Sequence, residues 1–377
     1  MPVLNQRHRT QDLRRDCEPF YSLYLCKRKT IMRKLIVVIT MILSVTVQAQ
    51  VPDAEGSLVK WMSLEEGMAL METQPKPVII DFYTDWCGWC KHMMKTTYAN
   101  PGLAQYINTN FYPIKFDAEG KDTVTYLGKE YKPTGTEKRA PHELAIKLLQ
   151  GKLSYPTTLF LNSYDKEKKE FGLNMLASGF LEDKKIEPIL VFTLENVNRN
   201  STLDEFRLRF EEAFYDSTLQ ARIDSVKWES IGNFFSATFS SDKKTLIFIN
   251  AEWCNACKVM KRTSFSDSLV SSYVKEKYNL IELPADYAEE IMFKGTIFKN
   301  KKLPQAPFHD LALALCRNNF ALPSVIVLNE NMEVIDGIPF YLPPSALNDI
   351  LHYFGDDEYK TNSWQDYITK RQGLGSK

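Results

Sequence analysis

The 377-residue sequence has no excess of charge of either sign and no long hydrophobic run. Its 47 basic residues balance its 47 acidic residues, and no basic patch is interleaved with aromatic residues. This argues against a nucleic acid as a partner. The apolar run over residues 35–47 has thirteen residues, whereas a membrane-spanning helix needs roughly 20. No later run is long enough either, so we expect no membrane-spanning segment after this one.

The run at 35–47 has the flanks of an export signal. Basic residues between 27 and 34 precede it, and Val47-Gln48-Ala49 follows it as a small-residue cleavage site. Residues 1–49 are therefore predicted to be a signal peptide with an upstream extension, and Met32 is the more natural start. An uncleaved membrane anchor is the alternative. No cysteine follows the run closely, so a lipid anchor has no acceptor. Cleavage after Ala49 leaves 38 basic and 44 acidic residues in an exported, periplasmic protein.

The cysteines point to redox chemistry. Two of the seven precede Gln50, and four of the other five form the pairs Cys87/Cys90 and Cys254/Cys257. In an oxidising compartment such Cys-x-x-Cys pairs are either disulfides or redox centres. A zinc site would need two more ligands close by, and a purely structural disulfide is the other alternative. The fifth, Cys316, lies on the apolar side of an expected helix and is predicted to be buried and inert.

An internal repeat divides the chain into two copies. An offset of 167 residues carries Val59–Leu64 onto Val226–Ile231 and Trp86-Cys87 onto Trp253-Cys254. The same offset holds as far as Pro156 and Pro323. We therefore predict one domain written twice, with domain 1 at 50–195, a helical linker at 196–221, domain 2 at 222–356 and a polar C-terminal tail at 357–377 that is loose from residue 360 onward.

Each copy has the same expected order of elements. Runs rich in β-branched and aromatic residues at 77–83 and 246–249 predict buried central strands, each followed by Trp-Cys-x-x-Cys-Lys and a helix. In the linker, Ser201 is the expected N-cap of a helix packed on one domain. The other predicted elements are strands at 111–116, 157–161, 280–283 and 324–328, hairpins at 123–132 and 290–299, and helices at 141–150, 182–193, 308–317 and 345–354.

This layout resembles the thioredoxin family over residues 56–194 and 222–355. The most specific segment is 81–90, which ends in Trp-Cys-Gly-Trp-Cys, joined to Tyr155-Pro156-Thr157. It is similar to exported bacterial thioredoxin-like proteins and to the C-terminal domain of thiol:disulfide interchange proteins. The resemblance implies an α/β protein with two tandem thioredoxin-like folds, each a central mixed β-sheet flanked by helices.

The resemblance also implies roles for the paired cysteines. Cys87 begins a helix, where the dipole favours a thiolate, so it is the expected nucleophile with a lowered pKa. Cys90 lies one turn along and would attack the mixed disulfide. Cys254 and Cys257 are the corresponding residues of the second copy. His142 and His309 are expected to be structural helix caps rather than catalytic groups.

Asp81 lies in the middle of an apolar strand, where an unpaired carboxylate is costly. By resemblance it is the buried acid that moves protons for Cys90, with Lys115 as its catalytic partner. Pro156 is expected to be cis, to lie beside the cysteines and to keep metal from bridging them, so no metal and no cofactor beyond the two disulfides is expected. The predicted substrate-binding residues are Trp86, Gly88, Trp89, Tyr155, Pro156, Trp253, Leu322 and Pro323.

The two sites are not expected to be equivalent. The offset places Phe248 where the first copy has Asp81, and Glu282 where it has Lys115. The dipeptide between the cysteines changes from Gly-Trp to Asn-Ala. The second copy therefore lacks the buried acid, and we expect the first copy to carry most of the turnover.

These observations predict an exported thiol-disulfide oxidoreductase that acts on protein substrates with thiols or disulfides. Its electron donor would be a membrane or soluble protein. The alternative is a non-catalytic binding module that holds an extended segment beside the prolines while its disulfides stay static. The direction of electron flow stays open, because it depends on reduction potentials that differ by tens of millivolts.

Overall fold

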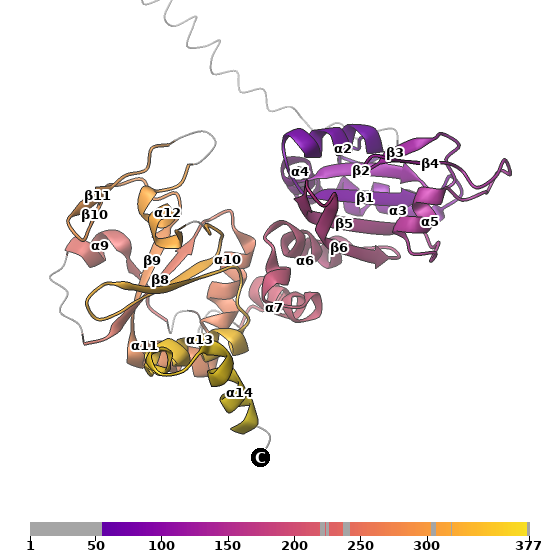
Figure 1. Cartoon of the computed structure of the whole chain (residues 1–377). Coiled ribbons are helices and arrows are strands. Elements are labelled where there is room, and N and C mark those ends of the chain that lie inside the picture. Colours follow the sequence, from indigo (N-terminus) through magenta and orange to yellow (C-terminus); the bar gives the residue numbers. More distant parts are fainter. Residues whose placement is uncertain are drawn as a thin grey trace, which may run out of the picture. The chain divides into compact units, whose positions relative to one another are not determined.

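The computed structural model describes residues 55–218, 223, 226–236, 242–302, 307–317 and 319–374. The predicted signal peptide and extension, residues 1–49, lie outside these ranges. Within them, no helix is both long enough and apolar enough to cross a membrane. The two copies of the repeat each contain a mixed β-sheet with helices on both faces (Figure 1).

The first sheet has the strand order β2-β1-β5-β6. The central strand β1 runs parallel to β2 and antiparallel to β5. Its apolar, β-branched sequence is buried along almost its whole length, as expected for a strand covered on both faces. A separate two-stranded hairpin, β3-β4, lies at the predicted position. The bounds are β1 Val78–Tyr83, β2 Tyr112–Asp117, β3 Val124–Tyr126, β4 Lys129–Tyr131, β5 Thr157–Asp165 and β6 Glu170–Ser178.

Helices cover both faces of the first sheet. On one face, Val78, Ile80 and Phe82 pack with residues of α2 and α5. On the other face, Ile79 packs with residues of α3, α4 and α6. Because side chains alternate along a strand, Asp81 lies on the same face as Ile79, under α3. The helices are α2 Leu64–Thr73, α3 Gly88–Lys95, η1 Thr97–Ala99, α4 Pro101–Asn110, α5 Glu143–Leu148 and α6 Asp183–Leu194.

The second sheet repeats the first, with one strand added at its edge. Its order is β13-β12-β8-β9-β7, and β8 runs parallel to β9 and antiparallel to β12. The central strand β8 is buried at every position. The bounds are β7 Glu229–Ser230, β8 Lys244–Asn250, β9 Tyr278–Pro284, β10 Ile291–Phe293, β11 Thr296–Phe298, β12 Ser324–Leu328 and β13 Val334–Pro339.

The helices of the second copy follow the same plan. The helix after the second Cys-x-x-Cys motif is a short α-helix, α10, that continues as a π-helical turn, η3. The bounds are α9 Ile231–Ser236, α10 Asn255–Val259, η3 Met260–Ser264, α11 Ser268–Lys277, α12 Asp310–Cys316 and α13 Pro344–Gly355.

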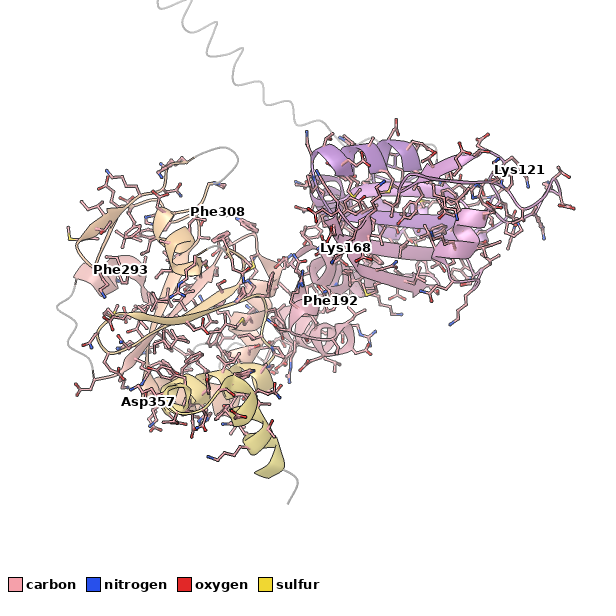
Figure 2. All side chains as sticks on the ribbon, viewed as in Figure 1. Lys121, Lys168, Phe192, Phe293, Phe308 and Asp357 are labelled. Carbon is pink, nitrogen blue, oxygen red and sulfur yellow. A yellow bond between two sulfur atoms is a disulfide. The ribbon has the colours of Figure 1, made fainter. Side chains whose placement is uncertain are left out.

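Between the sheets, η2 (Val197–Arg199) and α7 (Leu203–Tyr215) follow α6. Thr202, not the expected Ser201, is the N-cap of α7, and its hydroxyl accepts from the backbone N–H of Glu205. Phe206 and Phe210 are buried in the core that contains β8. Phe192 of α6, labelled in Figure 2, belongs to the same core. Leu203 of the same helix packs against the core of the first copy, so α7 contacts both copies and is not packed on one domain alone, contrary to the expectation from the sequence.

The C-terminal segment is more ordered than the sequence indicated. After η4 (Glu358–Lys360), residues Trp364–Leu374 form the helix α14. The ring of Tyr367 lies 5.2 Å from that of Tyr353 on α13, and Arg371 forms an ion pair with Asp349 at 2.7 Å. The expectation of a loose tail is wrong for this stretch, because a polar helix with two aromatic side chains, Trp364 and Tyr367, has enough contact to dock on α13. The predicted domain boundaries stay predictions.

Candidate active sites

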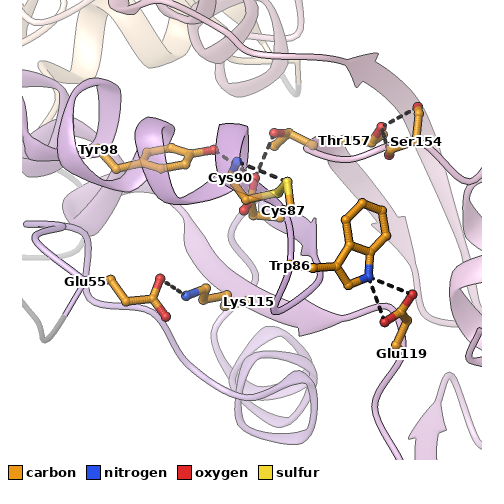
Figure 3. Close-up of a disulfide and its surroundings, with 11 residues drawn as sticks. Glu55, Trp86, Cys87, Cys90, Tyr98, Lys115, Glu119, Ser154 and Thr157 are labelled. Carbon is orange, nitrogen blue, oxygen red and sulfur yellow. Dashed lines mark hydrogen bonds and ion pairs between the residues drawn. A yellow bond between two sulfur atoms is a disulfide. The ribbon is translucent and has the colours of Figure 1, made fainter. Parts of the chain in front are cut away.

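The first Cys-x-x-Cys motif is a disulfide at the start of α3. Cys87 and Cys90 are bonded, and Cys87 is the N-cap of the helix (Figure 3). Its sulfur accepts a hydrogen bond from the backbone N–H of Cys90 at 3.1 Å. Helix N-termini stabilise negative charge, so this position suits a thiolate once the disulfide is reduced.

Exposed aromatic side chains flank the first disulfide. Trp86 is 52% exposed and Trp89 is 62% exposed, which is unusual for large apolar side chains. The indole N–H of Trp86 donates to the carboxylate of Glu119 at 3.0 Å, while the Trp89 ring lies 5.7 Å from that of Phe180. Glu119 and Phe180 were not found from the sequence, because neither lies in the motif.

The predicted proline loop lies beside the first motif. The Tyr155–Pro156 bond is cis, as expected, and so is Leu322–Pro323 in the second copy. The Tyr155 ring contacts that of Trp86 at 6.2 Å between centroids, edge to face. The structure therefore brings Trp86, Tyr155 and the disulfide of the motif to one surface.

Asp81 is fully buried on the face of β1 that α3 covers. One of its oxygens accepts hydrogen bonds from the hydroxyls of Thr158, at 3.1 Å, and Tyr98, at 3.3 Å. Within the described part of the chain, its second oxygen has no hydrogen-bond partner. Burial raises the pKa of Asp81 to about 7, and the hydrogen bond from Thr158, the charge of Lys115 and the hydrogen bond from Tyr98 oppose that rise. Such a carboxyl exchanges protons readily near neutral pH.

Lys115 lies where the sequence predicts but does not bind Asp81 directly. It is the register neighbour of Asp81 on β2, as the sequence predicted. Its ammonium, however, forms an ion pair with Glu55 (Figure 3). The pairing expected between Lys115 and Asp81 is therefore corrected: hydroxyl groups bind the carboxyl directly, and Lys115 acts on it through its charge. The long side chain of Lys115 carries its ammonium to Glu55, which is partly exposed to water, whereas the carboxyl of Asp81 is fully buried.

The second motif has the same backbone geometry as the first, and the cysteines of both motifs are buried. Cys254 and Cys257 form a disulfide, and Cys254 is the N-cap of α10. Cys254 is 0% exposed. Trp253 and Leu322, two of the three residues predicted to bind substrate in this copy, line one cavity with Cys254.

The buried polar group behind the first disulfide is replaced in the second copy by an apolar one. The offset of 167 carries Asp81, Tyr98 and Thr158 onto Phe248, Phe265 and Val325. All three replacements are fully buried, and the two phenylalanine rings lie 5.2 Å apart. Replacing every partner of a buried hydrogen-bonded group together leaves no unsatisfied atom. The sequence showed the loss of the acid, and the offset would also have revealed its two donors.

Glu282 does not take the place of the missing acid. Its carboxylate binds the ammonium of Lys261 at 2.6 Å and the side-chain amide of Asn250 at 2.6 Å. Glu282 lines a small pocket together with Cys257 and Lys258. The charge reversal relative to Lys115 is therefore balanced locally, by a lysine on η3.

A carboxylate that the sequence did not indicate lies on Cys254. Glu195, the C-cap residue of α6, has one oxygen 3.2 Å from the sulfur of Cys254. Its two oxygens also accept the backbone N–H groups of Asn255, at 2.9 Å, and Ala256, at 2.7 Å. No motif joins residues so far apart in the chain, so only the tertiary structure reveals this contact.

The remaining titratable candidates have structural roles. The ring nitrogens of His142 and His309 accept from the backbone N–H groups of Leu144 and Leu311 as N-caps, which confirms the expectation for both. Cys316 is a buried free thiol whose pKa is raised by burial. Over the residues that the structure describes, no group of three or more histidine, cysteine or acidic side chains is placed to hold a metal ion.

Fold and site together define a protein with two thioredoxin-like folds in tandem, each with a disulfide at the start of a helix. A family model named Thioredox_DsbH and described as "Protein of unknown function, DUF255" matches residues 49–172. The thiol:disulfide interchange protein DsbD of Salmonella typhimurium is 31% identical over 118 residues, which are 31% of this chain and 17% of that protein.

Two further relatives are similar to parts of the chain. An uncharacterized protein of Archaeoglobus fulgidus is 30% identical over 102 residues, which are 26% of this chain and 77% of that protein. A solved thioredoxin-fold protein from Helicobacter pylori has 17% identity and a TM-score of 0.31, over 42% of this chain and 99% of that one. The chain has a thioredoxin-like fold and is related, over part of its length, to the DsbD and DsbH proteins. It spans about a sixth of the length of DsbD.

Proposed function

We propose that this protein is an exported thiol-disulfide oxidoreductase that exchanges disulfides with protein substrates, and that Cys87 and Cys90 carry most of the turnover. The observation that carries the proposal is a disulfide at a helix N-terminus, between two exposed tryptophans, with an acid whose pKa is about 7 behind it. An extended substrate segment would lie against Trp86 and the Tyr155–Pro156 loop.

The proposed reduction of a substrate has two steps. The Cys87 thiolate attacks one sulfur of a substrate disulfide, forms a mixed disulfide and releases the other sulfur as a thiolate. Cys90 then loses its proton to the Asp81 carboxylate and attacks the Cys87 sulfur. This closes the Cys87–Cys90 disulfide and releases the second substrate thiolate. The substrate gains two electrons and the protein loses two, which a dithiol electron donor restores.

The second pair would act more slowly. The position that corresponds to Asp81 is occupied there by the apolar side chain of Phe248. We propose that the second domain serves as a slower relay or holds substrate. Export rests on the features of residues 1–49, and a periplasmic location would supply both an oxidising environment and protein disulfides.

Disabling each pair separately tests the function and its division between the sites. The protein without residues 1–49 is reduced with dithiothreitol, separated from it and mixed with a model protein disulfide. Cys87→Ser/Cys90→Ser should abolish most of the reduction, and Cys254→Ser/Cys257→Ser should leave most of it. Equal losses would contradict the dominance of the first site. No reduction by the wild-type protein would support the alternative, a binding module with static disulfides.

A further inference from the structure

A carboxylate binds the N-terminal turn of the helix that follows Cys254, whereas in the described part of the chain no carboxylate binds the first turn of the helix that follows Cys87. The carboxylate of Glu195 accepts the N–H groups of Asn255 and Ala256, the first two residues of α10. These groups would otherwise stabilise a thiolate on Cys254. At the equivalent place in the first copy, Gly88 has open space around the position of a side chain, and the Trp89 side chain is 62% exposed and packs on Phe180.

The carboxylate also covers the sulfur itself. A sulfur in a disulfide carries no proton, so the 3.2 Å separation between Glu195 and Cys254 is a direct contact between an oxygen and the sulfur. An incoming thiol has to reach the sulfur of Cys254 in order to attack it, and the carboxylate occupies part of the surface of a sulfur that is otherwise buried. Because that thiol attacks as an anion, an ionised carboxylate also repels it.

Glu195 is held in this position by its neighbours in the chain. Phe192 and Val197 are buried in the core that contains Cys254 and Cys257. The side chain of Asn196 accepts hydrogen bonds from Asn162 and Ser163 at the end of β5. The carboxylate is therefore a built feature of the fold and not a mobile surface group.

We propose that Glu195 controls the second Cys-x-x-Cys pair by covering Cys254 and, while ionised, by suppressing its thiolate and the approach of thiol substrates. The pair would then exchange disulfides only when the carboxylate is protonated or displaced. This proposal concerns the reactivity of Cys254 and holds whether or not Cys87 and Cys90 turn over substrates.

The charges around Glu195 give the proposal a pH dependence. Burial raises the pKa of Glu195 to about 7, against the two backbone N–H groups and the ammonium of Lys258, which lower it. Tyr106 of α4 also faces the carboxylate, and its phenol stays neutral in this range because burial raises its pKa well above the usual value. Suppression of Cys254 should therefore be strongest above pH 7 and should weaken as the pH falls below it.

Alkylation of Cys254 tests the proposal directly. The full chain carrying Cys87→Ser/Cys90→Ser is reduced with dithiothreitol, freed of it and treated with iodoacetamide from pH 6 to pH 9. Modification is measured by mass spectrometry of the peptide that contains Cys254. At pH 8, Glu195→Gln should raise the alkylation rate about tenfold or more, because like charge beside a thiol disfavours the thiolate. At pH 6 the difference should shrink.

Glu252→Gln is the matched control, because it removes an exposed carboxylate two residues before Cys254 and should change the rate less than twofold. The buried Cys316 thiol reports on folding and should stay unmodified in every variant. An unchanged rate in Glu195→Gln would show that the contact is only structural. A slower rate would show that Glu195 activates Cys254 as a base, and either result overturns the proposal.

The wild-type protein provides a test that no variant can spoil by misfolding. Oxidised protein is treated with mercaptoethanesulfonate, an anionic thiol, and the two disulfides are followed through their separate peptides. The Cys254–Cys257 disulfide should be reduced at least tenfold more slowly than Cys87–Cys90 at pH 8. Equal rates would overturn the proposal and the expectation of a slower second pair, and they would leave disulfide exchange by Cys87 and Cys90 untouched.

Discussion

Asp81 and Thr158 face each other across β1 and β5, and the hydroxyl of Thr158 donates to the buried carboxyl at 3.1 Å. The equivalent pair across β8 and β12 is Phe248 and Val325. The two copies therefore keep the same backbone register and differ in whether the centre of the sheet carries an acid. This difference allows the chemistry of the first site to be tested against a matched apolar version in the same chain.

Cys87 is expected to be the attacking thiol, because it caps α3 and Cys90 is one turn further along. In a chain without the second pair, Cys90→Ser should accumulate mixed disulfides with substrate proteins through Cys87. The adducts are detected on non-reducing gels and assigned by mass spectrometry. Adducts that formed instead through Cys90, in a Cys87→Ser chain, would reverse the assignment.

Asp81→Asn is expected to slow the second step of the exchange. The ionised carboxyl accepts the proton of Cys90, so in the wild-type protein the rate of substrate release should rise as the pH increases through about 7. The variant should lose roughly ten- to hundredfold in this rate at pH 7, and its rate should rise only at the higher pH where a thiol ionises unaided. Single-turnover release of a thiol from the mixed disulfide measures this step.

Asp85→Asn is the control for that measurement, since Asp85 is an exposed carboxylate close to the same motif. Its rate should match the wild type across the pH range. A rate of Asp81→Asn that also matched the wild type would mean that Cys90 passes its proton to water.

The same substitution should stabilise the first domain at neutral and higher pH. The folded pKa of Asp81, about 7, exceeds its ordinary value of 3.8, so the folded state binds the proton more tightly than the unfolded state. The stabilising effect of the protonated carboxyl is complete below pH 3.8 and is lost as the pH rises to about 7. Asn stays neutral, so the variant should gain about 2 to 4 kcal/mol at pH 8 and little at pH 4.

Hydrogen exchange of the amides of β1 as a function of urea reports this free energy for the first domain alone. The oxidised protein is used, so that the disulfide is the same in both chains. If Asp81→Asn were less stable than the wild type at pH 8, the charge of Lys115 and the two hydroxyl donors would have to compensate fully for the burial of the ionised carboxylate.

Residues 1–49 are expected to be absent from the mature protein. The prediction rests on the basic segment, the apolar run and the small-residue site that precede Gln50. Sequencing the N-terminus of protein isolated from its native cell envelope should give a start near Gln50. A product that kept residues 35–47 and sedimented with membranes would indicate an uncleaved anchor.

Much of the first site could be predicted from local patterns. A Cys-x-x-Cys motif after a buried strand and before a helix places both sulfurs at a helix start in either copy. Local patterns do not predict which partner a charged side chain binds when that depends on how deeply the side chain is buried. Lys115 was placed correctly beside Asp81 but pairs with Glu55, because its ammonium reaches toward the surface.

The sequence by itself determined the repeat, the order of elements, the paired cysteines and the loss of the acid in the second copy. These properties follow from local sequence patterns and from a constant offset between the copies, so they can be recognised without knowing which residues lie close together in the folded chain. Only the tertiary structure decided which groups bind Asp81, and that Glu195 lies on Cys254. Residues separated by 59 positions come together because the core that buries Phe192 and Val197 sets the path of the chain between them.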